Sequence, residues 1–484
     1  MRSTIDTRDI GAAVLACVLM GAAATSPALQ ARQAPAVAAP SPAGPWTGAI
    51  VMPNSRLGID ITLATNASKE WSGTIDITVQ GLRGAKLTNV VVDGRRISFA
   101  MVGIPGDPTF MGTLSDDGQG ISGTFTQGGA TLPFELKRGV RVLARPQEPK
   151  APFPYRSEEV SFRNAKADVR LAGTLTLPQG AGRFPAVLLI SGSGPQDRDC
   201  TIAGHKPFLL WADTLTRRGV AVLRVDDRGV GASERGTMNP TTADLAEDVR
   251  AGLAFLASRA DIDAAKVGLI GHSEGANIAA MVAADTPAAR FIVMLAGTGV
   301  RGDELLLQQV AAISTAQGAP KPIVDWDLAM RRRVYDQILA EKDGKPDVAA
   351  RRALVESVPP LPGVPDATVA RQQADLLLSA SSAPWVRYFL AYDPQASVSR
   401  VKVPVLTVNG ERDLQIPARE NVSALRTAIE AAGNANATIQ VVPNLNHLLQ
   451  TARTGLPEEY ESIEETIAPG VLTLVTDWVL ARVK

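Results

Sequence analysis

Residues 267–275 read VGLIGHSEG, and this stretch decides the fold. The apolar residues 267–270 predict a buried strand, and the small residues 276–284 predict a helix that follows it. Between them lies a G-x-S-x-G turn, in which a side chain at either glycine would collide with the strand or the helix. Such a turn strains the backbone of Ser273 and exposes its hydroxyl, while the helix N-terminus favours negative charge beside it. Ser273 is therefore predicted to be a nucleophile.

A serine hydroxyl is a weak nucleophile unless a base takes its proton. The chain contains three histidines, at positions 205, 272 and 447. His447 follows the strand predicted at Thr438–Val442, which is where the base of such a site is expected. His272 adjoins the nucleophile and must point away from it, and His205 is expected to pack in its own loop. We therefore predict His447 as the base.

The third member of the site should be a carboxylate in the loop after the preceding strand, Val403–Val408. Asp413 lies where this loop should turn back towards the site, and it would orient the His447 ring. Glu411 is the competing carboxylate, but it is closer to the strand end. The order serine, aspartate, histidine is the order that this kind of elbow requires.

Backbone donors for an oxyanion are expected at two places. One is the N–H of Glu274, which directly follows the nucleophile. The other belongs to the loop after the strand predicted at Phe184–Ile190, which reads SGSGP at residues 191–195. We assign the N–H of Ser193, with Gly194 as the alternative. The loop lacks the glycine and lysine spacing of a phosphate-binding loop.

Beyond residue 150 the pattern alternates between apolar strands and amphipathic helices. This alternation is typical of a mostly parallel, doubly wound sheet that is covered on both faces, and we assign residues 150–484 to such an α/β domain. The expected helices include Thr242–Arg259 and Gly470–Val483. The expected strands are Phe184–Ile190, Val220–Val225, Val267–Ile270, Phe291–Leu295, Val403–Val408 and Thr438–Val442.

A helical segment at about residues 301–400 interrupts this alternation, with helical patterns at Asp303–Gln317 and Val324–Lys342. It is too long for a single crossover connection. We expect a helical cap over the carboxyl ends of the strands, where ligands bind in such sheets. Trp385 in this cap, together with Gly194 and His272, is a candidate for the substrate pocket, although packing within the cap would also explain Trp385.

Residues 46–145 have the texture of a separate, small all-β domain. Short alternating runs such as Ile59–Leu63 and Arg96–Val102 are separated by turn signals such as Asp93-Gly94. These features are typical of a sandwich or barrel. The region has no histidine. We expect a structural or oligomerisation module, or alternatively a domain that shapes its neighbour's active site.

The N-terminus is typical of an export signal. Two arginines precede the apolar residues 10–24, which are too few to span a bilayer. We predict a signal peptide at residues 1–31, with cleavage near Ala28 or Ala31, and an Ala/Pro-rich linker at residues 32–45. The mature protein is then expected in the periplasm or outside the cell, without stable membrane insertion. Cys17 would be removed, leaving Cys200 with no partner for a disulfide within the chain.

The composition narrows the possible partners. The chain has 484 residues, and its 49 basic and 49 acidic residues balance, so no overall charge would draw it to nucleic acid. Two cysteines and three histidines disfavour a metal centre, and no motif points to a cofactor. A small-molecule substrate is the expected partner. The oligomeric state has no sequence signature here.

Five stretches carry a resemblance to a known group: SGSGPQDRD (191–199), VLRVDDRGVGAS (222–233), GHSEG (271–275), APWVRYFLAYDP (383–394) and NGERDLQIP (409–417). Together they resemble secreted bacterial α/β-hydrolases of the carboxylesterase type, which carry a β-rich N-terminal domain. The resemblance implies an α/β-hydrolase fold, activity on small acyl esters, and Ser273, Asp413 and His447 as the triad. The SGSG loop differs from the HG or HGGG of many lipases, which argues against a lipase.

The sequence is therefore compatible with three functions. The favoured one is a serine carboxylesterase that works through an acyl-enzyme intermediate. A peptidase or amidase on the same fold is the first alternative. A non-catalytic protein that binds a ligand through the β domain is the second.

Overall fold

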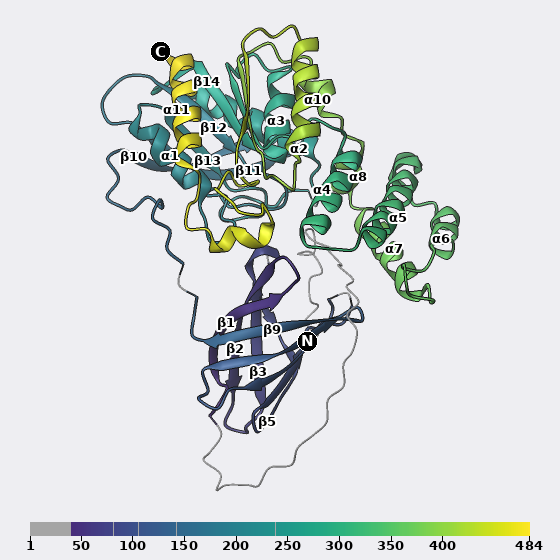
Figure 1. Cartoon of the computed structure of the whole chain (residues 1–484). Helices are drawn as coiled ribbons and strands as arrows, with labels where there is room; N and C mark the ends of the chain where they lie inside the picture. Colours follow the sequence, from purple (N-terminus) through teal and green to yellow (C-terminus); the bar gives the residue numbers. More distant parts are fainter. Residues whose placement is uncertain (1–39, 81, 105, 142, 238) are drawn as a thin grey trace, which may run out of the picture. The chain divides into compact units, whose positions relative to one another are not determined.

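The computed structural model describes residues 40–80, 82–104, 106–141, 143–237 and 239–484. The predicted signal peptide and most of the predicted linker lie outside the described residues. The chain divides into two compact units (Figure 1). The first holds the described residues up to Ala144 together with Ser314–Asp325 and Leu456–Ser462, and the second holds the remaining described residues.

The first unit is built on an antiparallel sheet. Chain neighbours pair along a meander in the order β4-β3-β2-β1-β9-β8-β7-β6-β5, so that the first strand also pairs with the last. The strands are β1 (Gly44–Val51), β2 (Arg56–Thr65), β3 (Trp71–Ile77), β4 (Leu82–Lys86), β5 (Thr88–Asp93), β6 (Arg96–Ala100), β7 (Thr109–Leu114), β8 (Gly120–Gln127) and β9 (Ala130–Arg138).

The alternating residues of these strands fill one apolar core. Phe110 is at its centre, with ring centroids of Phe99 at 4.8 Å and Phe134 at 5.3 Å. At the start of β1, Trp46 is buried, its Nε1 donates to the carbonyl of Pro42 at 2.8 Å, and the Arg138 guanidinium lies 4.3 Å from its ring centroid. The first and last strands are therefore joined by side chains as well as by backbone pairing.

The second unit is built on an eight-stranded sheet in the order β10-β11-β13-β12-β14-β15-β16-β17. All pairs from β13 to β17 are parallel, whereas β11 is antiparallel to both of its neighbours. The strands are β10 (Arg156–Asn164), β11 (Val169–Leu177), β12 (Phe184–Ile190), β13 (Ala221–Val225), β14 (Ile262–His272), β15 (Ile292–Leu295), β16 (Val405–Gly410) and β17 (Ala437–Val442).

Helices cover both faces of this sheet (Figure 1). One apolar cluster joins the sheet to α2 (Thr242–Ser258), α3 (Glu274–Ala283) and α10 (Ala418–Ala431). A second cluster joins its other face to α1 (Pro207–Arg217) and α11 (Pro469–Val483). This double cover explains why the central strands are continuous apolar runs.

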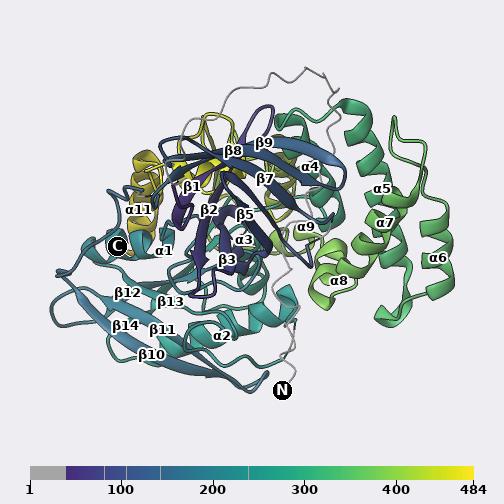
Figure 2. The same ribbon diagram turned by 90° about the horizontal axis from the view of Figure 1, so that it is seen from below.

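Six α-helices lie between β15 and β16, and we call residues 302–398 the helical insertion. Figure 2 shows that α5, α6 and α7 lie side by side. Glu341 joins three of its elements, because it accepts hydrogen bonds from Arg351 at 2.5 and 2.7 Å and from Arg387 at 3.0 Å. The hydrogen bonds from Arg351 are the main cause that lowers the pKa of Glu341 to about 2. The helices are α4 (Gly302–Ala316), α5 (Lys321–Ala340), α6 (Val348–Glu356), α7 (Thr368–Ala380), α8 (Pro384–Ala391) and α9 (Pro394–Val398).

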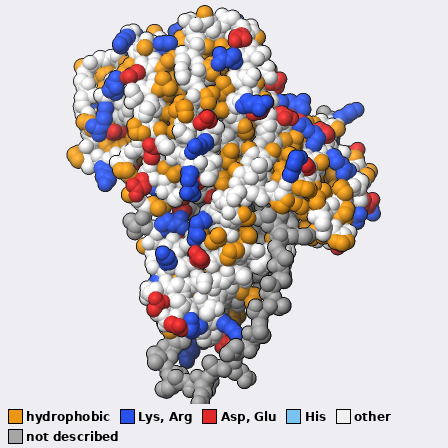
Figure 3. All heavy atoms as spheres, in the orientation of Figure 1, with side chains coloured by type: hydrophobic (Ala, Val, Ile, Leu, Met, Phe, Trp, Pro, Cys, Tyr) orange, Lys and Arg blue, Asp and Glu red, His pale blue; other side chains and the backbone are white. Residues whose placement is uncertain are grey.

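Basic and acidic side chains are interspersed on the face of the molecule in Figure 3. Among the described residues, no helix has the length and apolar character needed to cross a membrane. The same residues contain no group of three or more histidine, cysteine, aspartate or glutamate side chains that could hold a metal ion.

Candidate active site

The turn between β14 and α3 holds Ser273 in a strained conformation. Its backbone angles are φ 57° and ψ −122°, a region that residues with a side chain rarely adopt. The turn is anchored because the Ser273 N–H donates to the carbonyl of Leu295 on the neighbouring strand at 2.8 Å. Such strain persists only where the surrounding structure enforces it.

The glycines of this turn are required by its neighbours. A Cβ at Gly271 would overlap the carbonyl oxygen of Gly275, and a Cβ at Gly275 would overlap those of Ile190 and Ser191. A Cβ at Gly192 would lie 3.1 Å from the Ser273 Cβ, so the loop after β12 passes directly beside Ser273. The glycines therefore allow strand, loop and helix to meet at one point.

Replacing Gly275 by alanine is expected to destabilise the protein by about 1–3 kcal/mol, because the new methyl group can be accommodated only if β12 shifts. The free energy of unfolding, measured by chemical denaturation, checks this. Gly470→Ala is the matched control, since Gly470 also lies in the first turn of a helix but nothing stands within 4 Å of its Cβ position. Equal stability of the two variants would contradict the steric reading of the turn.

His447 and Asp413 form a buried pair in the loops after β17 and β16. His447 Nδ1 lies 2.8 Å from Asp413 Oδ2. The other carboxylate oxygen, Oδ1, accepts the N–H groups of Gln415 at 2.9 Å and Ile416 at 2.8 Å. Asp413 is 2% exposed and His447 4% exposed. The aspartate is thus held rigidly with one oxygen directed at the histidine.

Glu411, the competing carboxylate, faces a different partner. Its side chain is exposed, and its Oε2 accepts the N–H of Asn444 at 3.1 Å. The structure therefore brings Asp413, and not Glu411, to the His447 ring.

His272 connects the turn that holds Ser273 to the loop that holds His447. Its Nε2 lies 2.8 Å from the carbonyl oxygen of His447, and the two ring centroids are 4.8 Å apart. Burial lowers the pKa of His272 to about 3, so the ring is neutral at ordinary pH and its Nε2–H donates to the carbonyl. Ser273 follows His272 directly and so lies at the same edge as His447. Within the described residues no hydrogen bond joins Ser273 to His447, and such bonds often tighten only when substrate is bound.

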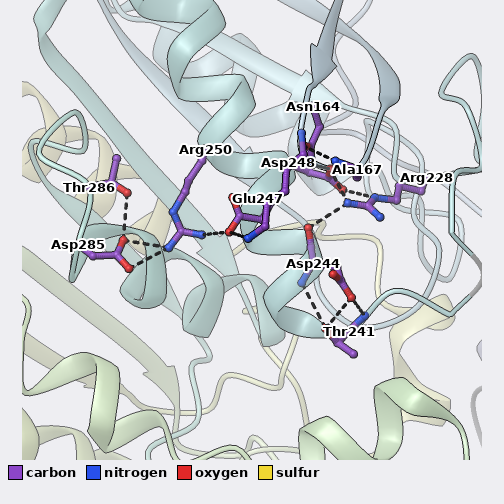
Figure 4. A network of polar contacts seen from close by, with 11 residues as sticks. Asn164, Ala167, Arg228, Thr241, Asp244, Glu247, Asp248, Arg250, Asp285 and Thr286 are labelled. Carbon is purple, nitrogen blue, oxygen red and sulfur yellow. Dashed lines mark hydrogen bonds and ion pairs between the residues drawn. The ribbon is translucent and has the colours of Figure 1, made fainter.

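The remaining histidine and the charged loops belong to structural networks. His205 is buried between Thr466 Oγ1 at 3.0 Å and Gln450 Nε2 at 2.9 Å. Arg228 donates two hydrogen bonds to the Asp248 carboxylate, at 2.6 and 2.9 Å. Figure 4 shows this pair beside the capping box that Thr241 and Asp244 form at the start of α2. Arg198 pairs in the same way with Asp226, at 3.1 and 2.7 Å. These contacts hold the loops after β12 and β13 in place.

The loop that carries Ser193 is tied down by Asp227. The Ser191 hydroxyl donates to both carboxylate oxygens of Asp227, at 2.9 and 3.1 Å, and the N–H of Gln196 donates to Oδ2 at 2.9 Å. On the other side of Ser273, Glu274 begins α3, so its N–H is one of the helix donors without a partner inside the helix. Ser193 and Glu274 therefore flank Ser273, one from a tethered loop and the other from the start of a helix.

Burial raises the pKa of Asp227 to about 7, although its hydrogen bonds act in the opposite direction. Between about pH 4 and pH 7 the folded protein thus keeps a proton that the unfolded chain releases, so this group lowers stability as the pH rises. Asp227→Asn should lack this dependence on pH. The difference in unfolding free energy between the variant and the wild type should therefore rise in favour of the variant from pH 4.5 to 7 and stay constant above pH 7. Denaturation at several pH values checks this, with the exposed Asp375→Asn as control. A constant difference across this range would contradict it.

The parallel sheet, the strained serine turn and the buried Asp–His pair define an α/β-hydrolase of the serine type. Residues 208–452 match the family described as serine aminopeptidase, S33 (Hydrolase_4), and the chain belongs to this family. The match spans every element that carries a proposed triad residue.

Several known proteins are similar to parts of this chain. Esterase EstD of Thermotoga maritima is 26% identical over 60% of this chain and 61% of its own length. Esterase FrsA of Yersinia enterocolitica is 32% identical over 30% of this chain and 33% of its own length. This chain therefore spans less than two thirds of either relative. Among solved structures, a Pyrococcus furiosus esterase aligns over 72% of this chain and all of its own, with 14% identity and a TM-score of 0.40.

Proposed function

We propose that this protein is a serine carboxylesterase that hydrolyses esters of small acyl groups. One observation carries the proposal: a buried His447–Asp413 pair, with 2.8 Å between His447 Nδ1 and Asp413 Oδ2, lies at the turn that holds Ser273. His272, which directly precedes the strained Ser273, makes the contact by donating to the carbonyl oxygen of His447. The names of the similar proteins EstD and FrsA support ester hydrolysis over other serine hydrolase reactions.

In the proposed mechanism the Ser273 hydroxyl attacks the ester carbonyl while His447 Nε2 takes its proton. Asp413 holds the ring through Nδ1 and stabilises its positive charge. The N–H groups of Ser193 and Glu274 stabilise the oxyanion of the tetrahedral intermediate. His447 then protonates the leaving alcohol, and an acyl-enzyme remains. Water, activated by the same histidine, releases the acid and restores Ser273.

The family's description favours a second candidate, an aminopeptidase that uses the same residues. Amide hydrolysis would follow the same steps with an amine as leaving group. A non-catalytic protein that binds ligand through the all-β unit is the third reading, and a serine-reactive phosphonate separates it from the other two.

Three further predictions belong to this proposal. Residues 1–31 act as a signal peptide that directs the protein to the periplasm or the medium. The helical insertion roofs the active site. The all-β unit has a structural role or shapes the site.

The proposal is tested with a panel of p-nitrophenyl esters from acetate to dodecanoate, beside amino-acid p-nitroanilides. We expect turnover of the short esters and kcat/KM that falls as the acyl chain lengthens. Faster turnover of the anilides would favour the aminopeptidase. If neither series reacts and the phosphonate does not label the protein, the enzymatic proposal is wrong.

A further inference from the structure

The Glu274 side chain is buried and accepts hydrogen bonds from two other elements, and it has no part in the mechanism above. It is 3% exposed, and its Oε1 accepts hydrogen bonds from the Thr242 hydroxyl at 2.6 Å and from the Trp385 indole Nε1 at 2.8 Å. Thr242 begins α2, and Trp385 lies on α8 of the helical insertion. One carboxylate next to the nucleophile therefore joins the elbow helix to two elements distant in sequence.

The second oxygen of this carboxylate is directed into the protein. Among the described residues, Oε2 is buried and accepts no hydrogen bond of ordinary geometry. The Ser193 side chain nevertheless lies near enough to lower the pKa of Glu274, although burial outweighs it and raises that pKa. The carboxylate thus adjoins the loop predicted to supply an oxyanion donor.

Trp385 is fixed at its opposite edge as well. Its ring stacks on Phe389, with centroids 5.2 Å apart and planes 21° apart. Phe389 shares an apolar cluster with Leu305 and Ile416, against which Trp385 packs. Ile416 is the residue whose N–H is bonded to Asp413. The indole therefore spans from the residue after the nucleophile to the loop of the proposed triad aspartate.

We propose that Glu274 is a positioning residue: its carboxylate holds the Trp385 indole as a wall of the acyl-binding site and so sets the acyl length that is accepted. This inference rests on the proposed esterase function. The physical reason is that a buried carboxylate is costly without its donors, so the indole N–H is held towards Glu274 and the ring cannot swing away from the nucleophile. A group that grows from the ester carbonyl would then meet a rigid aromatic face.

The test measures kcat and KM for acetyl and octanoyl p-nitrophenyl esters with Trp385→Phe and with Glu274→Met, which keeps the length of the side chain but removes the oxygen that accepts the indole N–H. Phenylalanine keeps an aromatic ring but removes the N–H that Glu274 accepts. We expect both variants to shift the octanoyl-to-acetyl ratio of kcat/KM about tenfold in the same direction. The double variant should shift it no further, because both changes break the same contact.

Trp326→Phe is the matched control, because it removes an indole N–H of the helical insertion that is bonded to the Pro359 carbonyl at 3.2 Å, away from Glu274. It should keep the wild-type ratio. Unchanged ratios in both test variants, additive shifts in the double variant, or an equal shift in the control would overturn the inference. Trp385→Phe alone decides the matter if Glu274→Met does not fold. If the wild type itself hydrolysed neither ester, the proposed function would be refuted instead.

Discussion

Ser273→Ala should lower kcat/KM for p-nitrophenyl acetate by at least on the order of a thousandfold, because the substitution removes the hydroxyl proposed to form the acyl-enzyme. The remaining rate would come from the oxyanion donors and from binding, which the substitution leaves in place. The fold should survive, since the Ser273 N–H still donates to the carbonyl of Leu295 and alanine is smaller than serine. Steady-state kinetics together with a thermal unfolding curve would show that activity is lost without loss of structure.

Ser258→Ala is the control for this experiment. Ser258 ends α2, and its exposed hydroxyl donates only to a carbonyl of its own helix, that of Phe255, at 2.7 Å. Its variant should react like the wild type and should still be labelled by a fluorophosphonate, whereas the Ser273 variant should not. Full activity in the Ser273 variant would exclude the elbow as the source of the nucleophile.

The part of the fold that surrounds the elbow could be predicted because local rules and tertiary structure agree there. The apolar run at residues 184–190 is strand β12 with the predicted bounds, and the run at 267–270 lies inside β14. Strands that are buried on both faces must be apolar throughout, which makes them visible in a sequence. The triad candidates could be named for the same reason, since each was expected at the end of a strand, and the structure brings Asp413 and His447 together.

Other features could not be predicted because they depend on contacts between distant segments. β10 is an edge strand with a half-exposed, alternating pattern, and neither it nor β11 carries the continuous apolar signal of the strands that were predicted. Glu274 was predicted only for its backbone N–H, since nothing in the elbow motif reveals that Trp385, which is 111 residues away, donates to its side chain. Asp227 was noted only as part of the stretch at residues 222–233 that carries the resemblance. The hydrogen bond from the Ser191 hydroxyl to Asp227 depends on how the loops after β12 and β13 pack together.

Asp413→Asn should lower kcat by about ten-thousandfold while changing KM by no more than a few-fold, because it moves the proton of the His447 ring from one nitrogen to the other. Asp413 Oδ1 already accepts two backbone N–H groups, at 2.9 and 2.8 Å, so asparagine must place its carbonyl oxygen there. Its NH₂ group then faces His447 Nδ1, which must accept a hydrogen bond instead of donating one. The ring proton moves to Nε2, and the atom that should take the Ser273 proton becomes a donor.

This argument distinguishes tautomer control from simple loss of charge, and Glu411→Gln supplies the comparison. Glu411 lies two residues from Asp413 and carries the same charge, but its Oε2 accepts the N–H of Asn444 and not the histidine. Its variant should therefore lose the same local charge with less than about a threefold change in kcat. If Glu411→Gln were the more damaging of the two, the glutamate would be the third member of the site, and the 2.8 Å contact between Asp413 and His447 would have a structural role only. If both variants kept full activity, His447 would need no carboxylate to orient it, and its role as the base would have to be reassigned.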